Sequence, residues 1–465
     1  MTKCWLVCTS CGAVKPPYPP TRFCGCGGAL EYQYDPEELR KAELPGVRSF
    51  WRYAPYMPEV RSVVTLGEGG TPLRRAGRIS EELGVEVYLK DETVNPTGSF
   101  RDRCASLMVS NALDLGHSLV VSASDGNLSA SVAAYSAKAG LSCTAVIPRG
   151  IDLGKLAQMI IYDAFVEEWG ETVEEAIEKA REIVSETGAY NATAELNPLN
   201  IEALKTIAFE IHEQMGVPEW IIAPAGSGGT VYALWKGFKE MEIIGDLKSA
   251  PRLVAVQADG CKPIVDAYLR GLDKPTRAPR VGTDISALKV ASPMYGEETL
   301  RAIRDSGGVA VAVSDEEILE SGRELARLEG VFAEPASSAT VACLKHLVRD
   351  GVVDRGERVV CLLTGSGLKT TDIIKALKVK RVRGYAGLPT KGAILRILSE
   401  GDTYGYAIWK RLGRTVTLGA VYQHLTDLES KGLIASFQRA GRRYFRLTDK
   451  GLRALKALDE LRDLL

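Results

Sequence analysis

The sequence predicts an α/β protein of about three domains, and three observations lead to this fold class. Between residues 51 and 377, short apolar runs rich in β-branched residues alternate with stretches of helical periodicity, the pattern of mostly parallel sheets covered by helices. Five of the ten cysteines lie within the first 26 residues. Residues 378–465 carry 18 Lys and Arg against 8 Asp and Glu, a net charge of +10, whereas the remainder of the chain carries −11. We therefore expect a cysteine-rich segment over 1–50, an α/β domain over 51–377, a linker over 378–388 and a basic domain over 389–465.

The composition excludes several classes of protein. Of the 465 residues, 45% are hydrophobic and 25% are charged, which is typical of folded globular proteins and excludes general disorder and collagen-like chains. No apolar run approaches the roughly 18 residues of a membrane span, and the first residues lack the pattern of a signal peptide. We expect a cytoplasmic protein that does not contact a membrane.

The first cysteines have the spacing of metal ligands. Cys8 and Cys11 are separated by two residues, Cys24 and Cys26 by one, and glycines surround both pairs. Two tight turns of this kind direct four thiolates at one tetrahedral Zn²⁺, so we predict a zinc-ribbon-like segment with a structural zinc ion. Cys4 is a further candidate ligand, and the alternative is that the cysteines bind no metal. The five cysteines farther along the chain are scattered through apolar stretches, where we expect them to be core residues.

Seven strands and seven helices follow in order through the α/β region. The β-branched apolar runs predict strands at Val85 to Leu89, Leu119 to Ser122, Cys143 to Ile147, Trp220 to Ala223, Leu253 to Gln257, Val309 to Val313 and Val359 to Leu363. The intervening periodicity predicts helices at Arg101 to Leu115, Asn127 to Ala139, Val173 to Thr187, Ile201 to Met215, Thr230 to Met241, Asp315 to Glu329 and Ser338 to Asp350.

The glycine-rich turn PAGSGGT, residues 224–230, stands between a predicted strand and a predicted helix. Glycines allow backbone N–H groups to converge, and a helix N-terminus favours an anion, so the turn is a candidate phosphate cradle. It matches neither the dinucleotide fingerprint nor the nucleotide-binding loop with its lysine. An ordinary tight turn is the alternative.

Several segments taken together resemble threonine synthase, a fold type II pyridoxal-phosphate enzyme. They are EGGTPL (68–73), YLKDETVNPTGSFRDR (88–103), SASDGNLSAS (122–131), GKLAQ (154–158), LKTIAFEIHEQMG (204–216), PAGSGGT (224–230), FAEPASSA (332–339) and LLTGSGLKTTD (362–372). The resemblance implies a two-lobed domain with the cofactor between the lobes. It implies that Asn127 lies near the pyridoxal hydroxyl and that Thr364 and Ser366 lie near the pyridine nitrogen. It also implies that the phosphate is surrounded by Gly226, Ser227, Gly228, Gly229 and Thr230.

The sequence departs from this family at residue 101. The family places after NPTGSF the lysine that forms an imine with pyridoxal phosphate, and this chain has Arg101 there. A guanidinium stays protonated and cannot supply the neutral amine, so we expect no intact catalytic group and a non-covalent ligand, either pyridoxal phosphate or another phosphorylated molecule. Asp125, in the asparagine loop, would repel a substrate carboxylate. The alternative is an enzyme that recruits another amine such as Lys90.

The basic C-terminal segment predicts a winged helix. Helices are expected at Thr390 to Ser399, Tyr404 to Leu412 and Leu418 to Lys431, followed by strands at Ile434 to Gln438 and Tyr444 to Leu447 and by a last helix from Asp449. YGYAIWKRL, AVYQHLTDLESKGLI and GRRYFRLTDKGLRAL resemble PadR-type transcriptional regulators. The third helix would enter a DNA major groove. The candidate DNA contacts are Thr415, Thr417, Gln423, Arg442 and Arg443, and we assign Tyr422 to the core of this domain. A winged helix used for protein contact is the alternative.

These patterns predict a ligand-responsive transcriptional regulator whose threonine-synthase-like domain is a non-catalytic sensor. Its expected partners are double-stranded DNA and a small phosphorylated metabolite or an amino acid. The leucines of GLRALKALDELRDLL predict a homodimer through the last helix, and pairing through the large domain is equally open. The main alternative is a working threonine synthase, which converts O-phosphohomoserine to threonine and phosphate, with an accessory DNA-binding domain. A bifunctional enzyme and regulator is a third possibility.

Overall fold

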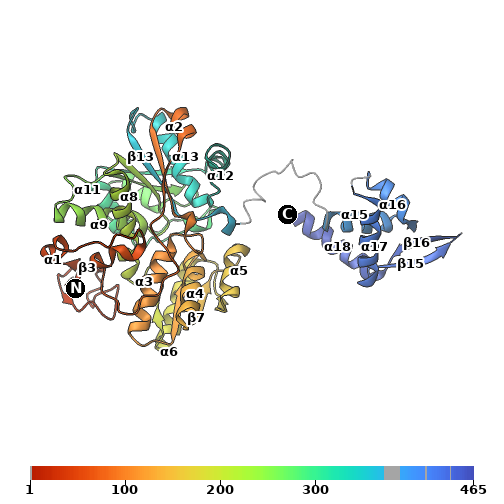
Figure 1. The fold of residues 1–465 in the computed structure, drawn as a ribbon, viewed down its shortest axis with the longest axis horizontal. Helices are drawn as coiled ribbons and strands as arrows, with labels where there is room; N and C mark the ends of the chain where they lie inside the picture. Colours follow the sequence, from red (N-terminus) through yellow and green to blue (C-terminus); the bar gives the residue numbers. More distant parts are fainter. Residues whose placement is uncertain (1–2, 371–387, 414–415, 440, 465) are drawn as a thin grey trace. The chain divides into compact units, whose positions relative to one another are not determined.

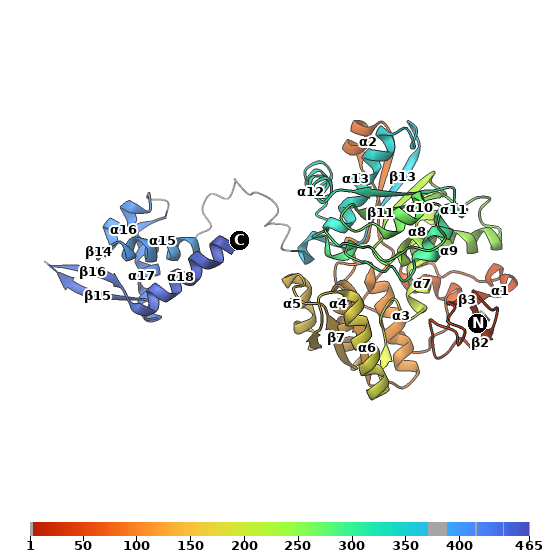
Figure 2. The same cartoon turned by 180° about the vertical axis from the view of Figure 1, so that it is seen from behind.

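A computed structural model describes residues 3–370, 388–413, 416–439 and 441–464. Its internal contacts divide the chain into two units, Met1–Ile373 and Ile374–Leu465. The first unit has two lobes, each built on its own sheet, and Figures 1 and 2 show them from opposite sides. The second unit is a small assembly of helices with a three-stranded sheet.

The larger lobe contains a six-stranded sheet with the order β12-β11-β10-β13-β5-β4. Its strands are β4 (Leu73–Arg75), β5 (Glu86–Asp91), β10 (Trp220–Pro224), β11 (Arg252–Ala258), β12 (Val309–Val313) and β13 (Arg358–Leu363). All neighbours are parallel except the pair β4 and β5. Alternate residues of β10 enter different cores, Trp220 and Ile222 on one face and Ile221 and Ala223 on the other. Both faces are therefore covered, as expected of a parallel sheet.

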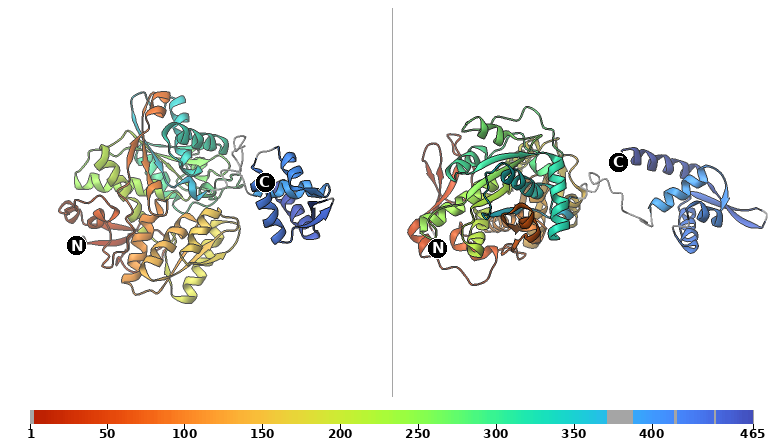
Figure 3. Two further views of the ribbon diagram at one scale, coloured as in Figure 1. Left: turned by 45° about the vertical axis from the view of Figure 1, so that its right-hand side comes forward. Right: turned by 90° about the horizontal axis from the view of Figure 1, so that it is seen from above.

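Helices from different parts of the chain cover the two faces of this sheet. The core on one face includes residues of α2 (Gly77–Leu83), α12 (Asp315–Glu324) and α13 (Pro335–Arg349). The core on the other face includes residues of α7 (Leu199–Leu204), α8 (Thr206–Met215), α9 (Gly229–Ile244), α10 (Pro263–Leu269) and α11 (Gly296–Asp305). Figure 3 shows this lobe from two further sides.

The smaller lobe contains a parallel four-stranded sheet with the order β8-β7-β6-β9. Its strands are β6 (Leu119–Ala123), β7 (Ser142–Ile147), β8 (Phe165–Glu168) and β9 (Tyr190–Asn191). Its helices are α3 (Arg101–Asp114), α4 (Asn127–Ala139), α5 (Leu153–Ile161) and α6 (Val173–Thr187). Val121 and Val146 pack with α6, whereas Ala145 and Ile147 pack on the opposite face with Met159 of α5.

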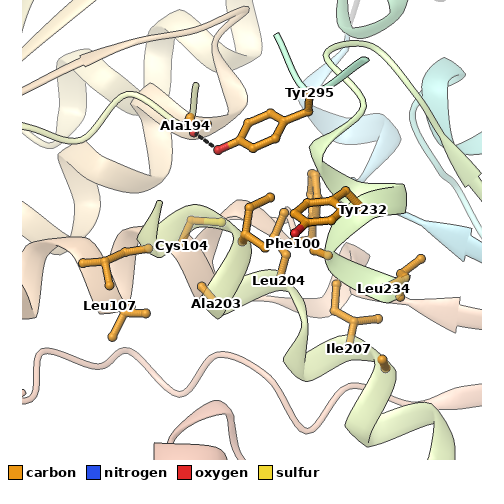
Figure 4. Packing of buried hydrophobic residues seen from close by; sticks show 14 of the residues in the cluster. Phe100, Cys104, Leu107, Ala194, Ala203, Leu204, Ile207, Tyr232, Leu234 and Tyr295 are labelled. Carbon is orange, nitrogen blue, oxygen red and sulfur yellow. Dashed lines mark hydrogen bonds between the residues drawn. The ribbon is translucent and has the colours of Figure 1, made fainter. Parts of the chain in front are cut away.

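The main core joins the two lobes. Figure 4 shows Phe100, Cys104 and Leu107, around the start of α3, packed near residues of α7, α8 and α9. In the same core Tyr295 is 1% exposed, and its hydroxyl donates to the carbonyl of Ala194 at 3.1 Å. The five scattered cysteines are buried, which confirms their expected place in the core.

The N-terminal segment forms a separate antiparallel sheet with the order β2-β1-β3. Its strands are β1 (Cys4–Cys8), β2 (Val14–Lys15) and β3 (Leu30–Tyr34), and the connection to the lobes includes α1 (Pro36–Arg40) and η1 (Phe50–Tyr56). Leu6, Leu30 and Tyr32 are at most 1% exposed and belong to the main core, so this small sheet is anchored on the two-lobed body.

Two long predicted helices are interrupted in the structure. The stretch predicted at Ile201 to Met215 is divided at Lys205 into α7 and α8. The stretch predicted at Asp315 to Glu329 continues after α12 as a π-helix, η4 (Leu325–Glu329). The remaining short helical turns are η2 (Glu92–Val94), η3 (Ser286–Leu288) and η5 (Gly367–Lys369).

The second unit has the element order of a winged helix. Its helices are α15 (Leu388–Ser399), α16 (Gly405–Arg411), α17 (Leu418–Ser430) and α18 (Asp449–Leu464), and its strands are β14 (Thr403–Tyr404), β15 (Ile434–Arg439) and β16 (Arg442–Leu447). The strands form an antiparallel sheet with the order β14-β16-β15. Val421, Leu425 and Leu428 of α17 are at most 2% exposed and pack with Phe445 of β16.

Candidate functional site

A cleft lies where the carboxyl ends of strands from both lobes meet, and it contains about 750 Å³ of space, part of it open to solvent. Loops that follow β6, β10 and β13 contribute to its walls, which is where open parallel sheets bind ligands. The residues that line it include Phe100, Arg101, Ser124, Asp125, Asn127, Leu128, Ala194, Glu195, Pro224, Gly226, Ser227, Gly228, Gly229, Thr230, Ser286, Glu334 and Thr364. The structure therefore brings together the residues predicted to contact the cofactor, except Ser366.

The glycine-rich loop has the geometry of an anion cradle. It precedes α9, a helix of 16 residues whose N-terminus faces this cleft. Gly228 has φ +94°, and a Cβ there would lie 2.2 Å from Oγ1 of Thr299. A Cβ on Gly226 would lie 2.4 Å from the carbonyl oxygen of Ala287. The buried hydroxyl oxygen of Ser227 has no hydrogen-bond partner among the described residues, so it is available to a ligand.

Asn127 and Thr364 converge on one carboxylate, that of Glu334. Nδ2 of Asn127 donates to Oε2 of Glu334 at 2.9 Å, and Oγ1 of Thr364 donates to its Oε1 at 3.0 Å. Oδ1 of Asn127 has no partner among the described residues although the side chain is buried. A buried amide oxygen without a partner is costly, and a ligand donor in the cleft would satisfy it.

Ser366 has a different role in the structure. Its hydroxyl accepts a hydrogen bond from the backbone N–H of Leu368 at 3.3 Å and caps η5, and Ser366 is not among the residues that line the cleft. The predicted contact between this residue and the cofactor ring remains an expectation from the family resemblance.

Arg101 is the first residue of α3, and its side chain lies in the cleft. Nη1 donates to Oδ1 of Asn200 at 2.8 Å, and the guanidinium lies 4.7 Å from the ring centroid of Phe100. Burial raises the pKa of Glu195, another cleft residue, and the positive charge of Arg101 opposes this shift. The guanidinium thus adds positive charge to a cleft that already contains the anion cradle.

None of the residues that line the cleft in the described part of the chain is a lysine. The amine of Lys90 is fully buried away from the cleft and donates to Oε2 of Glu210 at 2.6 Å and to the carbonyl of Thr71 at 2.8 Å. The amine of Lys369 donates to the carbonyl of Thr97 and to Gln158, at 2.9 and 2.7 Å. Both amines are committed to structural hydrogen bonds.

Lys155 is the lysine whose amine contacts the cleft wall. It donates to Oγ of Ser286 at 3.2 Å and lies 3.5 Å from Oδ2 of Asp125. Burial alone would lower the pKa of Lys155, but the carboxylates of Asp125, Glu334 and Asp152 raise it above its ordinary value. Its amine is therefore held protonated, which disfavours attack on an aldehyde. The ion pair between Lys155 and Asp125 also balances the negative charge that the Asp125 carboxylate brings to the cleft.

The four predicted metal ligands form one cluster in the N-terminal segment. The Sγ atoms of Cys8, Cys11, Cys24 and Cys26 all lie within 4.8 Å of one another. The separations are 3.5 Å between Cys8 and Cys26 and 3.8 Å between Cys11 and Cys24. Four thiolates at 2.3 Å from a tetrahedral zinc ion would be about 3.8 Å apart, so the cluster fits such an ion. Cys4 is not part of the cluster.

The winged-helix unit presents most of its predicted DNA contacts on its surface. Thr417 caps the N-terminus of α17 by accepting from the N–H of Ala420 at 3.2 Å, and Gln423 is exposed on the same helix. Arg442 is exposed beside the ring of Tyr404, at 5.3 Å, whereas Nη2 of Arg443 donates to Oε2 of Glu429 at 2.7 Å. The remaining candidate, Thr415, lies outside the described residues.

Some residues that line the cleft or contact its lining were not singled out from the sequence. Glu334 lies in the segment FAEPASSA, which we assigned to the family resemblance without a role, and Lys155 lies in GKLAQ in the same way. Asn200 and Glu195 stand in a stretch without a motif. Their roles depend on the meeting of the two lobes, which local sequence patterns do not encode.

In the described residues we find no helix with the length and apolar character needed to cross a membrane.

Comparisons with known proteins cover both units. Residues 64–365 match the family described as pyridoxal-phosphate dependent enzyme, and residues 394–457 match the PadR-like family of transcriptional regulators. A threonine synthase of Methanocaldococcus jannaschii is 43% identical over 380 residues, which is 78% of this chain and 93% of the relative. A threonine synthase of Methanosarcina acetivorans is 40% identical over 375 residues, which is 78% of this chain and 92% of the relative.

Solved structures agree on the fold of the first unit. A threonine deaminase of T.th. has a TM-score of 0.55 at 26% identity and matches 68% of this chain and 96% of its own. A maize serine racemase has a TM-score of 0.56 at 21% identity and matches 66% of this chain and 92% of its own.

Proposed function

Because the chain belongs to the family of pyridoxal-phosphate dependent enzymes and carries a C-terminal PadR-like domain, we propose that it is a ligand-responsive transcriptional regulator with a non-catalytic sensor domain. The sensor takes a phosphorylated ligand in the cleft of the two-lobed unit. The winged helix binds double-stranded DNA, and the protein acts as a homodimer. A zinc ion in the cysteine cluster stabilises the N-terminal segment.

The observation that carries this proposal is the arginine at the start of α3. Arg101 extends into the cleft, where it bonds to Asn200. A guanidinium is a planar hydrogen-bond donor that remains charged, so it binds an anion but forms no imine. The amines of Lys90, Lys155 and Lys369 are each hydrogen-bonded to oxygen acceptors. Among the described residues, those that line the cleft therefore offer groups that bind an anion and include no lysine amine.

The rest of the cleft still fits a phosphate-bearing ring. Gly226 and Gly228 let the loop pack closely against Ala287 and Thr299, where a Cβ would clash. The hydroxyl of Ser227 and Oδ1 of Asn127 have no hydrogen-bond partner among the described residues. When bound, pyridoxal phosphate supplies an aldehyde and an electron-withdrawing ring, and only the ring and the phosphate would be recognised here. The same features admit another phosphate monoester or an amino acid derivative.

The conformational link follows from the position of the cleft between the lobes. A ligand that contacts both the cradle of the larger lobe and Asn127 of the smaller lobe stabilises a closed arrangement relative to an open one. Such a preference changes DNA affinity only when the two arrangements present the winged helices differently.

The second candidate is a working threonine synthase with an accessory DNA-binding domain, and the names of the relatives favour it. It requires a lysine other than residue 101 to carry the cofactor, and a bifunctional protein has the same requirement. The two-lobed fold alone does not decide, because the same fold supports several activities.

One experiment separates these functions. The full chain is incubated with pyridoxal phosphate, reduced with borohydride and digested for mass spectrometry, and threonine formation from O-phosphohomoserine is measured in parallel. We expect no modified lysine and no threonine, together with specific binding to a duplex from its own promoter region. A reduced cofactor on one lysine with threonine production refutes the non-catalytic proposal. Absence of binding to any such duplex at low salt refutes the DNA-binding role.

The wing arginine gives a prediction for DNA binding. Arg442→Ala removes an exposed cation, so we expect weaker binding to all duplexes and a log–log salt slope that is smaller in magnitude by about 0.9, the value for one phosphate contact. Gln423→Ala should instead weaken the binding free energy for the specific site by about 1–3 kcal/mol and leave nonspecific binding unchanged. Fluorescence anisotropy over a salt series measures both. Arg327→Ala, an exposed arginine on the first unit, is the control, and an equal effect there would contradict the assignment.

The cysteine cluster gives a prediction for metal content. Elemental analysis of the purified chain should find one zinc ion, and Cys11→Ser should abolish it because the cluster then offers three thiolates. The N-terminal sheet would lose its link between the two cysteine pairs, so the melting temperature of the first unit should fall by several degrees. This corresponds to a loss of stability on the order of 1–3 kcal/mol. Cys4→Ser is the matched control because Cys4 lies outside the cluster. Zinc retained by Cys11→Ser would remove the assignment.

A further inference from the structure

The charged side chains of the cleft are mostly acidic. Among the described residues that line it, Arg101 supplies one positive charge, whereas Asp125, Glu195 and Glu334 supply three carboxyl groups. The ammonium group of Lys155, which contacts the wall through Ser286, adds a second positive charge. Acidic groups therefore outnumber basic groups in a cleft whose glycine-rich loop has the geometry to bind a phosphate.

Two buried oxygen atoms on the smaller lobe lack hydrogen-bond donors. Oδ2 of Asp125 and Oδ1 of Asn127 have no hydrogen-bond partner among the described residues. The amine of Lys155 lies 3.5 Å from Oδ2 of Asp125 but donates instead to Oγ of Ser286 and to the backbone carbonyl of Asp125, at 3.2 and 3.4 Å. Carboxylate and amide oxygens only accept hydrogen bonds, so a ligand that satisfies these two atoms has to donate.

The two acceptors and the glycine-rich loop lie on different lobes, and η3 connects them. Gly226 packs closely on this turn, since a Cβ there would lie 2.4 Å from the carbonyl oxygen of Ala287. The preceding residue, Ser286, accepts from Lys155, whose amine is 3.5 Å from Asp125. Because Gly226 and Asp125 line the same cleft, one small molecule can contact both.

We propose that the ligand of this cleft is a phosphate monoester that carries a primary ammonium group. The inference rests on the phosphorylated ligand of the proposed function and names the second functional group of that ligand. The phosphate lies in the glycine-rich loop, and the ammonium donates to Oδ2 of Asp125 and to Oδ1 of Asn127. An ammonium offers three donors and no acceptor, and its charge offsets the excess of carboxyl groups. A carboxylate at the same place would be repelled by Asp125.

A charged donor suits these acceptors better than a neutral one. Burial raises the pKa of the Glu195 carboxyl, and the charge of Asp125 adds to this effect, so these two carboxyl groups repel each other. A bound ammonium offsets that repulsion, whereas a hydroxyl leaves it in place and donates a single hydrogen bond. Hydrogen bonds that involve a charged group are also about twice as strong as neutral ones.

Isothermal titration calorimetry of the full chain at pH 7 tests the preference with two matched pairs of phosphates. Pyridoxamine 5′-phosphate and pyridoxine 5′-phosphate differ only by an amine in place of a hydroxyl, and so do O-phosphoethanolamine and 2-hydroxyethyl phosphate, which have no ring. We expect the amine of a pair to bind at least about 10-fold more tightly than the alcohol. The pair that contains the tighter amine shows whether an aromatic ring is part of the ligand.

Two variants assign the preference to Asp125. Asp125→Asn keeps the size of the side chain but removes its charge, so we expect the preference for the amine to fall below about twofold while the affinity for the alcohol changes little. Asp152→Asn is the matched control, because the carboxylate of Asp152 lies 3.6 Å from the same amine of Lys155 but is not among the described residues that line the cleft. This variant should keep the full preference. Circular dichroism establishes that both variants are folded.

Each outcome bears on one of two statements. Equal or weaker binding of the amine in both pairs, or a preference that survives in folded Asp125→Asn, would refute the ammonium contact and leave the phosphorylated ligand intact. Loss of the preference in both variants would show that it acts through Lys155 and would also refute the contact. Absence of binding by all four phosphates would refute the phosphorylated ligand of the proposed function itself. If Asp125→Asn does not fold, the comparison of amine with alcohol on the wild-type chain decides.

Discussion

Arg101→Lys should convert the cleft from one that binds its cofactor reversibly to one that becomes covalently labelled. After incubation with pyridoxal phosphate and borohydride reduction, we expect close to one cofactor per chain at position 101 of the variant and only background labelling of the wild type. The reason is that the substitution restores a primary amine at the first residue of α3, where the side chain already lies in the cleft beside the anion cradle. Peptide mass spectrometry and the absorbance of the bound cofactor measure the change.

Two further variants control this result. Arg101→Met has neither the amine nor the guanidinium, so it should remain unlabelled, and it should bind free phosphate esters more weakly than the wild type because one cation is lost. Lys155→Met in the Arg101→Lys background should still be labelled at position 101. Labelling of Lys155 or Lys369 in the wild-type chain would contradict the conclusion that these amines are unavailable. Unlabelled Arg101→Lys would show that the cleft has lost more than the nucleophile.

The sequence was sufficient where a pattern is local. All seven strands predicted in the α/β region occur in the structure, and Val309 to Val313 has the predicted bounds. Central strands of a parallel sheet are buried on both faces, so they appear in the sequence as nearly continuous apolar runs that a local pattern can identify. The helix at Asn127 to Ala139 is likewise as predicted, because it begins after a glycine turn and ends at Gly140 in the left-handed conformation.

The sequence was insufficient where tertiary contacts decide. The helix α5 was missed because its single charge is buried and its outer face is apolar, so the periodicity that signals a surface helix is absent. Tyr422 was assigned to the core of the winged helix, and this prediction was wrong, since the side chain is 44% exposed. Its aromatic character suggested burial, but it lies on the outward face of α17 next to Gln423. The cleft itself was predicted through family resemblance, because Asn127, Glu334 and Thr364 meet only when two lobes assemble.

The position of Arg101 depends on a buried ionic network two residues farther along α3. The guanidinium of Arg103 is fully buried and makes two bonds of 2.8 Å to the carboxylate of Glu92. Its Nη1 donates to Oε1 of Glu210 at 2.6 Å, and the amine of Lys90 donates to the other oxygen of Glu210. The network joins α3 to the end of β5 and to α8, so it fixes the first turn of α3 and with it the residue that enters the cleft.

Arg103→Met should therefore be strongly destabilising. The methionine fills part of the volume but leaves the carboxylate of Glu92 buried without its cation, so we expect the free energy of unfolding at pH 7 to fall by about 3–5 kcal/mol. Urea denaturation followed by tryptophan fluorescence measures this loss in the transition of the first unit. Arg149→Met is the matched control, because the pair formed by Arg149 and Glu171 is 65% and 70% exposed and should be worth less than about 1 kcal/mol. Equal losses in the two variants would contradict the assignment.

The network also predicts how the loss varies with pH. Burial alone would raise the pKa of Glu210, but Arg103 and Lys90 lower it to about 2. A carboxyl whose folded pKa is depressed contributes stability that is fully present above its unfolded value near 4.5 and is lost as the pH falls through about 2. In Arg103→Met the pKa of Glu210 in the folded state rises because one of its two neighbouring cations is gone. The loss of stability on acidification therefore begins at a higher pH. Denaturation series from pH 7 to pH 3 should show the variant losing stability earlier than the wild type, and parallel curves would show that Arg103 does not hold this carboxylate in its charged form.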